Sequence, residues 1–280
     1  MPDTAYYVLT VTMSVMSFML GLRVGQGSRK LALVAFGGVL MLLLFKAYLN
    51  HHPALEAALF PWEDYLFFQG YALFPPALFT FGLATAVLPR GRNRRACAMF
   101  AALLLCVSLF TERWMLLPHE LPASGRVADA HHHLPQSTGY SCAPACCVML
   151  LSYWDVDANE PEMATFCRTL PNYGTTFFNL YRGLRLKLSG APYRVRIVEE
   201  SPEELRARAV PAIMMNGRNH VVCVSFGESE VVVHDPQLSH HQPISFSAFR
   251  KEYGGAAVVV ERLPVGNGAT AGFTSAPSMR

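Results

Sequence analysis

Charge is scarce in this chain. Asp, Glu, Lys and Arg make up 15% of its 280 residues, whereas an average soluble domain carries roughly 25%. Long uncharged runs fill the first 117 residues, and most charges lie after that point or in short connections. We therefore expect part of the chain to face lipid rather than water.

A basic stripe with interleaved aromatic residues is also missing. Such a stripe is the usual mark of a nucleic-acid-binding surface, and the formal net charge of +3 is small and scattered. We therefore expect no nucleic-acid partner. The sequence contains no internal repeat either, which excludes a solenoid or other repeat architecture.

Four apolar runs occupy residues 5–22, 31–49, 66–88 and 96–111. A helix needs about 20 mostly apolar residues to cross the hydrocarbon core. The first three runs meet this requirement, and the fourth does so if it extends to Leu117 with its charges at the interface. The runs lack the polar face of a soluble bundle, and no basic segment of a signal peptide precedes the first. We expect an all-α transmembrane region of about four helices over residues 1–122.

The positions of Lys and Arg predict the orientation of this region. The first connection, RVGQGSRK, and the third, PRGRNRRA, are basic, whereas residues 50–65 between the second and third runs hold no Lys or Arg. Basic loops stay in the cytoplasm, so everything after the fourth run is predicted on the outer side of a cytoplasmic membrane. If the fourth run does not cross, the C-terminal half lies in the cytoplasm instead.

The pattern changes after residue 122. Three segments with helical spacing come first, SCAPACCVMLLSYW, EPEMATFCRTL and TTFFNLYRGLRLKLSG, and strand-like segments follow, YRVRIVE, PAIMMN, HVVCVSF, EVVVHD and AAVVVERL. Two short helices, SPEELRARA with a capping box and SFSAFRKEYGG, fall among the strands. Helices followed by an antiparallel sheet predict an α+β domain over residues 123–263. Residues 264–280 predict a flexible tail.

Four polar residues of the second half have the types and order of a thiol active site. Cys142 begins a predicted helix, where the dipole and free N–H groups stabilise a thiolate. His220 precedes one predicted strand and Asp235 ends the next, so strand pairing would bring a base and its orienting acceptor together. Gln136, six residues before Cys142, could donate to an oxyanion together with the Cys142 backbone N–H.

The segments LPQSTGYSCAPACCVMLLSYW and NHVVCVSFGESEVVVHDP together resemble the papain-like peptidases that process bacteriocin leader peptides, family thirty-nine of the cysteine peptidases. In that family a Gln precedes the Cys by six residues, a distant His heads a strand, and an Asp-Pro follows on the next strand. The resemblance covers about residues 134–263. It implies a papain-like fold, hydrolysis of a peptide or protein substrate without a cofactor, and catalytic roles for Gln136, Cys142, His220 and Asp235.

The sequence departs from that family at two points. Ala143 stands where the family usually has Gly after the Cys, and no GxxxxGK[ST] motif indicates a fused ATP-binding cassette. We therefore expect a stand-alone membrane-anchored relative, with the lipid bilayer and a separately encoded export system as its partners. Two other functions stay open: a transglutaminase-like acyltransferase with the same order of Cys, His and Asp, and a non-catalytic membrane binding module.

The other cysteines and histidines are expected to have structural roles. Cys146 and Cys147 are expected to pack in the core, with a disulfide to Cys167 or Cys223 as the alternative in an oxidising compartment. Two histidine groups, His131–His133 and His234 with His240 and His241, lack the defined ligand spacing of zinc sites. We expect no metal site, and we expect residues 131–133 to form an extended lead-in to the domain.

Overall fold

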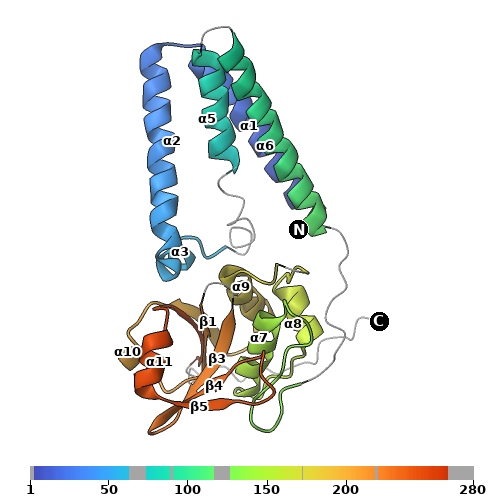
Figure 1. The fold of residues 1–280 in the computed structure, drawn as a ribbon, viewed down its shortest axis with the longest axis vertical. Helices are drawn as coiled ribbons and strands as arrows, with labels where there is room; N and C mark the ends of the chain where they lie inside the picture. Colours follow the sequence, from blue (N-terminus) through green and yellow to red (C-terminus); the bar gives the residue numbers. More distant parts are fainter. Residues whose placement is uncertain are drawn as a thin grey trace.

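The computed structural model describes residues 3–62, 74–88, 91–116, 127–171, 173–217 and 220–263. Its N-terminal part consists of helices (Figure 1), namely α1 (Asp3–Gly25), α2 (Arg29–Asn50), α3 (Pro53–Leu59), α5 (Phe74–Val87) and α6 (Arg92–Leu116). The expected domain boundary near residue 122, the first part of the expected span 66–88 and the expected tail 264–280 lie outside the described residues.

Helix α2 is, within the described ranges, the one helix long and apolar enough to cross a membrane. It has 22 residues and a mean hydropathy of 2.1, and 6% of its apolar window is buried inside the protein. Shorter apolar stretches occur at Val11–Gly25 and Pro75–Val87. Helix α6 runs for 25 residues to Leu116, and Leu117, the expected end of the fourth apolar run, lies outside the described residues. The membrane spans themselves, that of α2 included, remain predictions.

Helices α1 and α5 approach each other backbone to backbone at two glycines. A Cβ on Gly21 would lie 2.1 Å from the carbonyl oxygen of Phe79, and a Cβ on Gly82 would lie 2.2 Å from that of Phe18. Small residues at helix contacts are typical of membrane bundles, because close backbone packing replaces the hydrophobic driving force that lipid removes.

The C-terminal part is an α+β domain with helices on both faces of one sheet (Figure 1). The six strands are antiparallel in the order β1-β6-β2-β3-β4-β5. They are β1 (Tyr193–Val198), β2 (Ala212–Met215), β3 (Val221–Phe226), β4 (Glu230–His234), β5 (Gln242–Ser245) and β6 (Ala257–Arg262). The helices-then-sheet order predicted from the sequence is confirmed.

Two apolar cores flank the sheet, which explains why its central strands are apolar on both faces. One core joins the sheet to α7 (Cys142–Ser152), α8 (Glu160–Phe166) and α9 (Phe177–Lys187). The other joins it to α10 (Pro202–Ala207) and α11 (Phe246–Glu252), through Leu205 and Phe249. Alternate residues of β2 and β6 therefore enter opposite cores.

Strand β5 and helix α3 are elements that the sequence did not predict. Strand β5 is a four-residue edge strand that contains Pro243; proline is tolerated in a sheet at an edge, where its missing N–H is not needed by a neighbour. Helix α3 lies in the connection between the second and third apolar runs, with Pro53 in its first turn.

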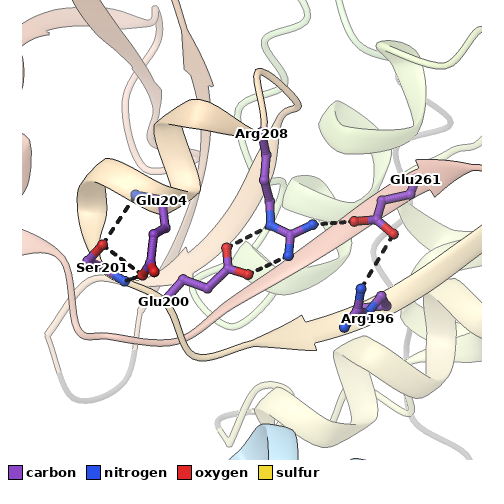
Figure 2. Close-up of polar contacts among 6 residues, drawn as sticks. All are labelled: Arg196, Glu200, Ser201, Glu204, Arg208 and Glu261. Atoms are coloured by element: carbon purple, nitrogen blue, oxygen red, sulfur yellow. Dashed lines mark hydrogen bonds and ion pairs between the residues drawn. The ribbon is translucent and has the colours of Figure 1, made fainter.

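Arg208 links α10 to the neighbouring sheet strands (Figure 2). Its Nε donates to Glu200 Oε2 at 2.6 Å, and its Nη atoms donate to Glu200 and to Glu261 on β6. Arg196 on β1 lies 3.9 Å from the second oxygen of Glu261. The hydrogen bonds that Arg208 donates to Glu200 are the largest cause of its raised pKa, so the guanidinium stays charged and holds the two carboxylates together.

Helix α3 contacts the α+β domain. The backbone N–H of Ala54 donates to Glu199 Oε1 at 2.6 Å, and His52 Nδ1 lies 3.2 Å from the other oxygen of Glu199. On the same side Arg185 donates to the carbonyl of Pro61 at 2.6 Å, and Ala57 is buried in the core that holds α7 and α9. Helix α3 and the residues next to it are therefore packed on the domain (Figure 1).

Replacing Gly82 by alanine should weaken the pairing of α1 and α5. The added methyl group would meet a backbone oxygen, which cannot rotate away, so we expect a loss of about 1–3 kcal/mol from overpacking. Thermal unfolding of the full chain in detergent measures this loss. Gly38→Ala on α2 is the matched control, because no atom lies within 4 Å of its Cβ position; equal melting temperatures for the two variants would contradict the packing.

Candidate active site

Helix α7 places Cys142 at the surface end of a buried helix. Residues 143–151 are all buried, whereas Cys142 itself is only partly buried. Before it, Ser141 Oγ accepts from the backbone N–H of Thr138 at 3.1 Å and donates to the Thr138 carbonyl at 3.2 Å. This turn fixes the start of α7, where backbone N–H groups lack helical partners and favour negative charge.

His220 and Asp235 lie together, as strand pairing requires. His220 directly precedes β3 and Asp235 directly follows β4, and the register of these strands pairs Cys223 with His234. His220 Nε2 lies 2.8 Å from Asp235 Oδ1, which also accepts from the backbone N–H of Gln237 at 2.8 Å. The carboxylate therefore has a fixed orientation toward the imidazole.

The second ring nitrogen of His220, Nδ1, is available for a hydrogen bond with the thiol. Nδ1 is buried and has no hydrogen-bond partner among the described residues. The pKa of His220 is raised, first by the influence of the Cys142 thiol and then by Asp235, against the opposing effect of burial. Both groups therefore favour the protonated form of the imidazole.

Gln136 lies on a loop that several hydrogen bonds hold in place. Its backbone N–H donates to the carbonyl of Pro236 at 2.8 Å, next to Asp235. Its side-chain Nε2 donates to the Thr138 carbonyl at 2.7 Å, and an amide group carries a second N–H for another acceptor. The next residue, Ser137, donates its N–H at 2.9 Å to Glu160, a buried carboxylate in the first turn of α8.

Glu160 is a supporting residue that the sequence did not reveal. It is fully buried, and it anchors the Gln136 loop from a helix that comes later in the chain. The sequence shows it only as one of two glutamates in a helix start, NEPE, where acidic residues are common. No local pattern separates such an anchor from an ordinary first-turn glutamate.

An open groove lies beside the Gln136 loop. Its volume is about 550 Å³, which lies within the usual range of ligand pockets. Its walls are two loop segments, 135–139 and 236–239. An extended peptide chain can lie in such a groove, next to Gln136 and the Asp-Pro loop.

The histidines before the domain are more ordered than an extended lead-in. His132 has a φ of 57°, and its ring stacks on Tyr153 with centroids 3.9 Å apart. His133 is buried, and its Nε2 lies 3.0 Å from the carbonyl oxygen of Leu238. The segment therefore packs against the loop that follows Asp235 and Pro236. The expectation of a plain extended segment is wrong, because these contacts order the segment.

His234 lies on the other side of the strand from Asp235. It is buried, and its Nε2 lies 2.9 Å from the hydroxyl of Tyr153. Burial lowers its pKa to about 4, with further lowering by His133, His241 and His132. Because its ring is neutral and faces the histidine group, it is a poor candidate for the base. Among the described residues, no group of three or more His, Cys, Asp or Glu side chains could hold a metal ion.

The remaining thiols of the domain differ from Cys142 in their surroundings. Cys146, Cys147, Cys167 and Cys223 are all fully buried. Burial raises the pKa of Cys146, Cys147 and Cys223 well above the ordinary thiol value, so these groups stay protonated at neutral pH. A protonated buried thiol is a poor nucleophile.

A papain-like peptidase fold accounts for this arrangement of helices, antiparallel sheet and site, and the family comparison agrees. Residues 131–264 match the model of the peptidase C39 family. The matched residues make up just under half of the chain. A relative is an uncharacterised protein of Methanothermobacter marburgensis, 29% identical over 128 residues, which are 45% of this chain and 86% of the relative.

Solved structures of peptidase domains are also similar. A double-glycine-motif protease from an AMS/PCAT transporter, in complex with the leader peptide, is 18% identical, with 51% of this chain and 99% of that chain covered and a TM-score of 0.42. The peptidase domain of Streptococcus ComA, a bifunctional ABC transporter, is 18% identical, with coverages of 46% and 96% and a TM-score of 0.40. The C39-like domain of a Vibrio parahaemolyticus toxin secretion protein is 16% identical, with coverages of 45% and 98% and a TM-score of 0.36.

Replacing Asp235 by asparagine should destabilise the domain in a pH-dependent way. A raised pKa of His220 in the folded state contributes stability that is fully present below the unfolded value, about 6.5, and lost as the pH rises through the folded value. Asparagine keeps an acceptor oxygen but removes the charge. We expect a loss of about 1 kcal/mol at pH 6 and a smaller loss at pH 9, measured by thermal unfolding. A deficit that is as large at pH 9 would contradict this coupling.

Proposed function

We propose that residues 123–263 form a cysteine peptidase that hydrolyses peptide bonds at the outer face of a cytoplasmic membrane. The observation that carries this proposal is the arrangement of Cys142, His220 and Asp235, in which an imidazole with a raised pKa is bonded to a carboxylate and interacts with a thiol at a helix start. The match of residues 131–264 to a peptidase family supports the reaction class.

Each residue of the site has a chemical role in this proposal. His220 takes the proton of Cys142, and the thiolate attacks the carbonyl carbon of the scissile bond. The second N–H of the Gln136 amide and the Cys142 backbone N–H donate to the oxyanion. Asp235 keeps the imidazole oriented and stabilises its charge. His220 then gives the proton to the leaving amine, and water attacks the thioester to release the acid.

Helices α1, α2, α5 and α6 anchor this peptidase in the bilayer in our proposal, as a transmembrane region over residues 1–122. The starts of α2 and α6, with Arg29 and Arg92, lie at the end of the helices away from the domain, whereas α3 lies against it (Figure 1). Since basic connections stay in the cytoplasm, this arrangement supports a domain on the outer side. The substrate that we propose is a peptide that is exported or secreted by a separate system.

Replacing Cys142 by alanine should abolish peptide cleavage while the fold survives. The nucleophile is lost, but alanine fits a helix start and removes only one sulfur atom from a partly buried position. The experiment incubates the full chain in detergent with a library of secreted peptides and identifies new termini by mass spectrometry. We expect loss by a factor of at least about 10³, as for other nucleophile removals.

Cys146→Ala is the matched control, because it removes another thiol from the same helix. The Cys146 thiol donates to the Val221 carbonyl and does not face His220. This variant should retain cleavage. Equal activity of the Cys142→Ala protein would refute the proposal. A ligated product in place of a free carboxylate would reassign the enzyme to acyl transfer, and a thiol at Cys142 that resists covalent probes would indicate a binding module.

The outer location predicts the behaviour of reporter fusions. Alkaline phosphatase needs an oxidising compartment to fold, so a fusion after Leu263 should be active and a fusion after Gln26, in the first basic connection, should be inactive. A green fluorescent protein fused at the same two positions should give the reverse pattern and serves as the control. An inactive phosphatase and a fluorescent protein after Leu263 would place the domain in the cytoplasm.

A further inference from the structure

A pair of core thiols lies close enough to form a covalent link. Cys147 on α7 and Cys167, the residue that ends α8, have their Sγ atoms 3.9 Å apart. A disulfide bond has a length of about 2.05 Å, so the sulfur atoms must approach each other by about 2 Å for the bond to form. Both residues are fully buried.

The packing around Cys167 keeps its sulfur atom at this place. Helix α9 crosses over it at Gly183, where an added Cβ would lie 2.3 Å from Cys167 Sγ and 3.0 Å from the Cys167 backbone nitrogen. The absence of a side chain at Gly183 leaves the space that this sulfur occupies. The neighbouring Cys146 is engaged elsewhere, because its thiol donates to the Val221 carbonyl on β3 at 3.4 Å.

We propose that Cys147 and Cys167 form a structural disulfide that ties the nucleophile helix α7 to α8. This inference rests on the outer location given under Proposed function, because an oxidising compartment is where disulfides persist. The two thiols lose two protons and two electrons as the S–S bond forms. The disulfide of a thiol oxidoreductase, or oxidised glutathione, accepts them and is reduced to two thiols.

The bond must form during folding. In the finished domain both sulfur atoms are enclosed, and no oxidant of that size can reach them. Once formed, the link closes a loop whose ends are 20 positions apart in sequence, and it stabilises the domain by limiting the unfolded chain. It also removes Cys147 from thiol exchange with the nucleophile on the same helix.

Differential labelling tests the link in the full chain. The protein is produced in a bacterial host with an oxidising periplasm, purified in detergent, denatured without reductant and treated with N-ethylmaleimide. We expect two of the seven cysteines to stay unlabelled until reductant is added. Trypsin leaves both residues on one peptide, 127–168, and a second cut by a glutamyl endopeptidase after Glu162 separates them, so the pieces should stay linked until reduction.

Variants assign the pair and its effect. Cys147→Ser should abolish the link and lower the melting temperature by about 5–10 °C, whereas the matched control Cys146→Ser should keep the link. Labelling of all seven cysteines without reductant, or a link that Cys146→Ser removes, overturns the proposal even if the Cys147→Ser protein does not fold.

The outcome is separable from that of the proposed peptidase function. Reaction of Cys142 with a thiol-directed probe and peptide cleavage report on the catalytic proposal in the same preparation. A reactive Cys142 with seven free thiols refutes the disulfide alone. A linked pair with an unreactive Cys142 supports the disulfide and refutes the peptidase.

Discussion

The burial of helix α7 is the constraint on which the rest of the domain depends. A helix that is apolar on every side must be covered on every side, and here the sheet, α8 and α9 together enclose residues 143–151. Only the two end residues of the helix, Cys142 and Ser152, are partly exposed. The exposure of Cys142 is thus a consequence of core packing, and the thiol is placed by a rigid element with the positive end of the helix dipole behind it. A site on such an element keeps its geometry better than one on a loop.

Loops from distant parts of the sequence meet at this helix end, and hydrogen bonds fasten them to one another. The Gln136 loop is bonded to Pro236 on one side and to Glu160 on the other, while His133 supports Leu238 from behind. The β3–β4 pair brings His220 to Asp235 without help from these loops. Two independent supports therefore converge: the sheet fixes the imidazole and carboxylate, and the loop network fixes the amide. Catalytic groups must keep their positions to within about 0.5 Å. The buried carboxylate of Glu160 serves this requirement, because it holds the Gln136 loop in place.

Local rules predicted the features of the sequence that depend on neighbours along the chain. The capping box at Ser201, the start of a helix at Cys142 and the meeting of His220 with the residue after β4 follow from helix-end chemistry and strand pairing. Features that depend on tertiary contacts were not predictable. Strand β5 contains a proline and becomes a strand only because β4 offers an edge, the turn at His132 exists because its ring packs on Tyr153, and Glu160 anchors a loop that lies more than twenty residues earlier. In the N-terminal part, length and hydropathy make α2 long and apolar enough to cross a membrane, whereas such local measures do not single out the remaining helices.

One edge of the sheet lies against the N-terminal helical part of the chain. An exposed edge strand offers unpaired backbone groups to other chains and invites aggregation. One edge, β5, is short and carries Pro243. The other edge, β1, ends next to Glu199, whose carboxylate accepts the N–H of Ala54 and lies beside His52. Helix α3 thus packs beside the edge strand that the domain alone would leave open (Figure 1). The contact between α3 and the domain therefore also covers one end of its sheet.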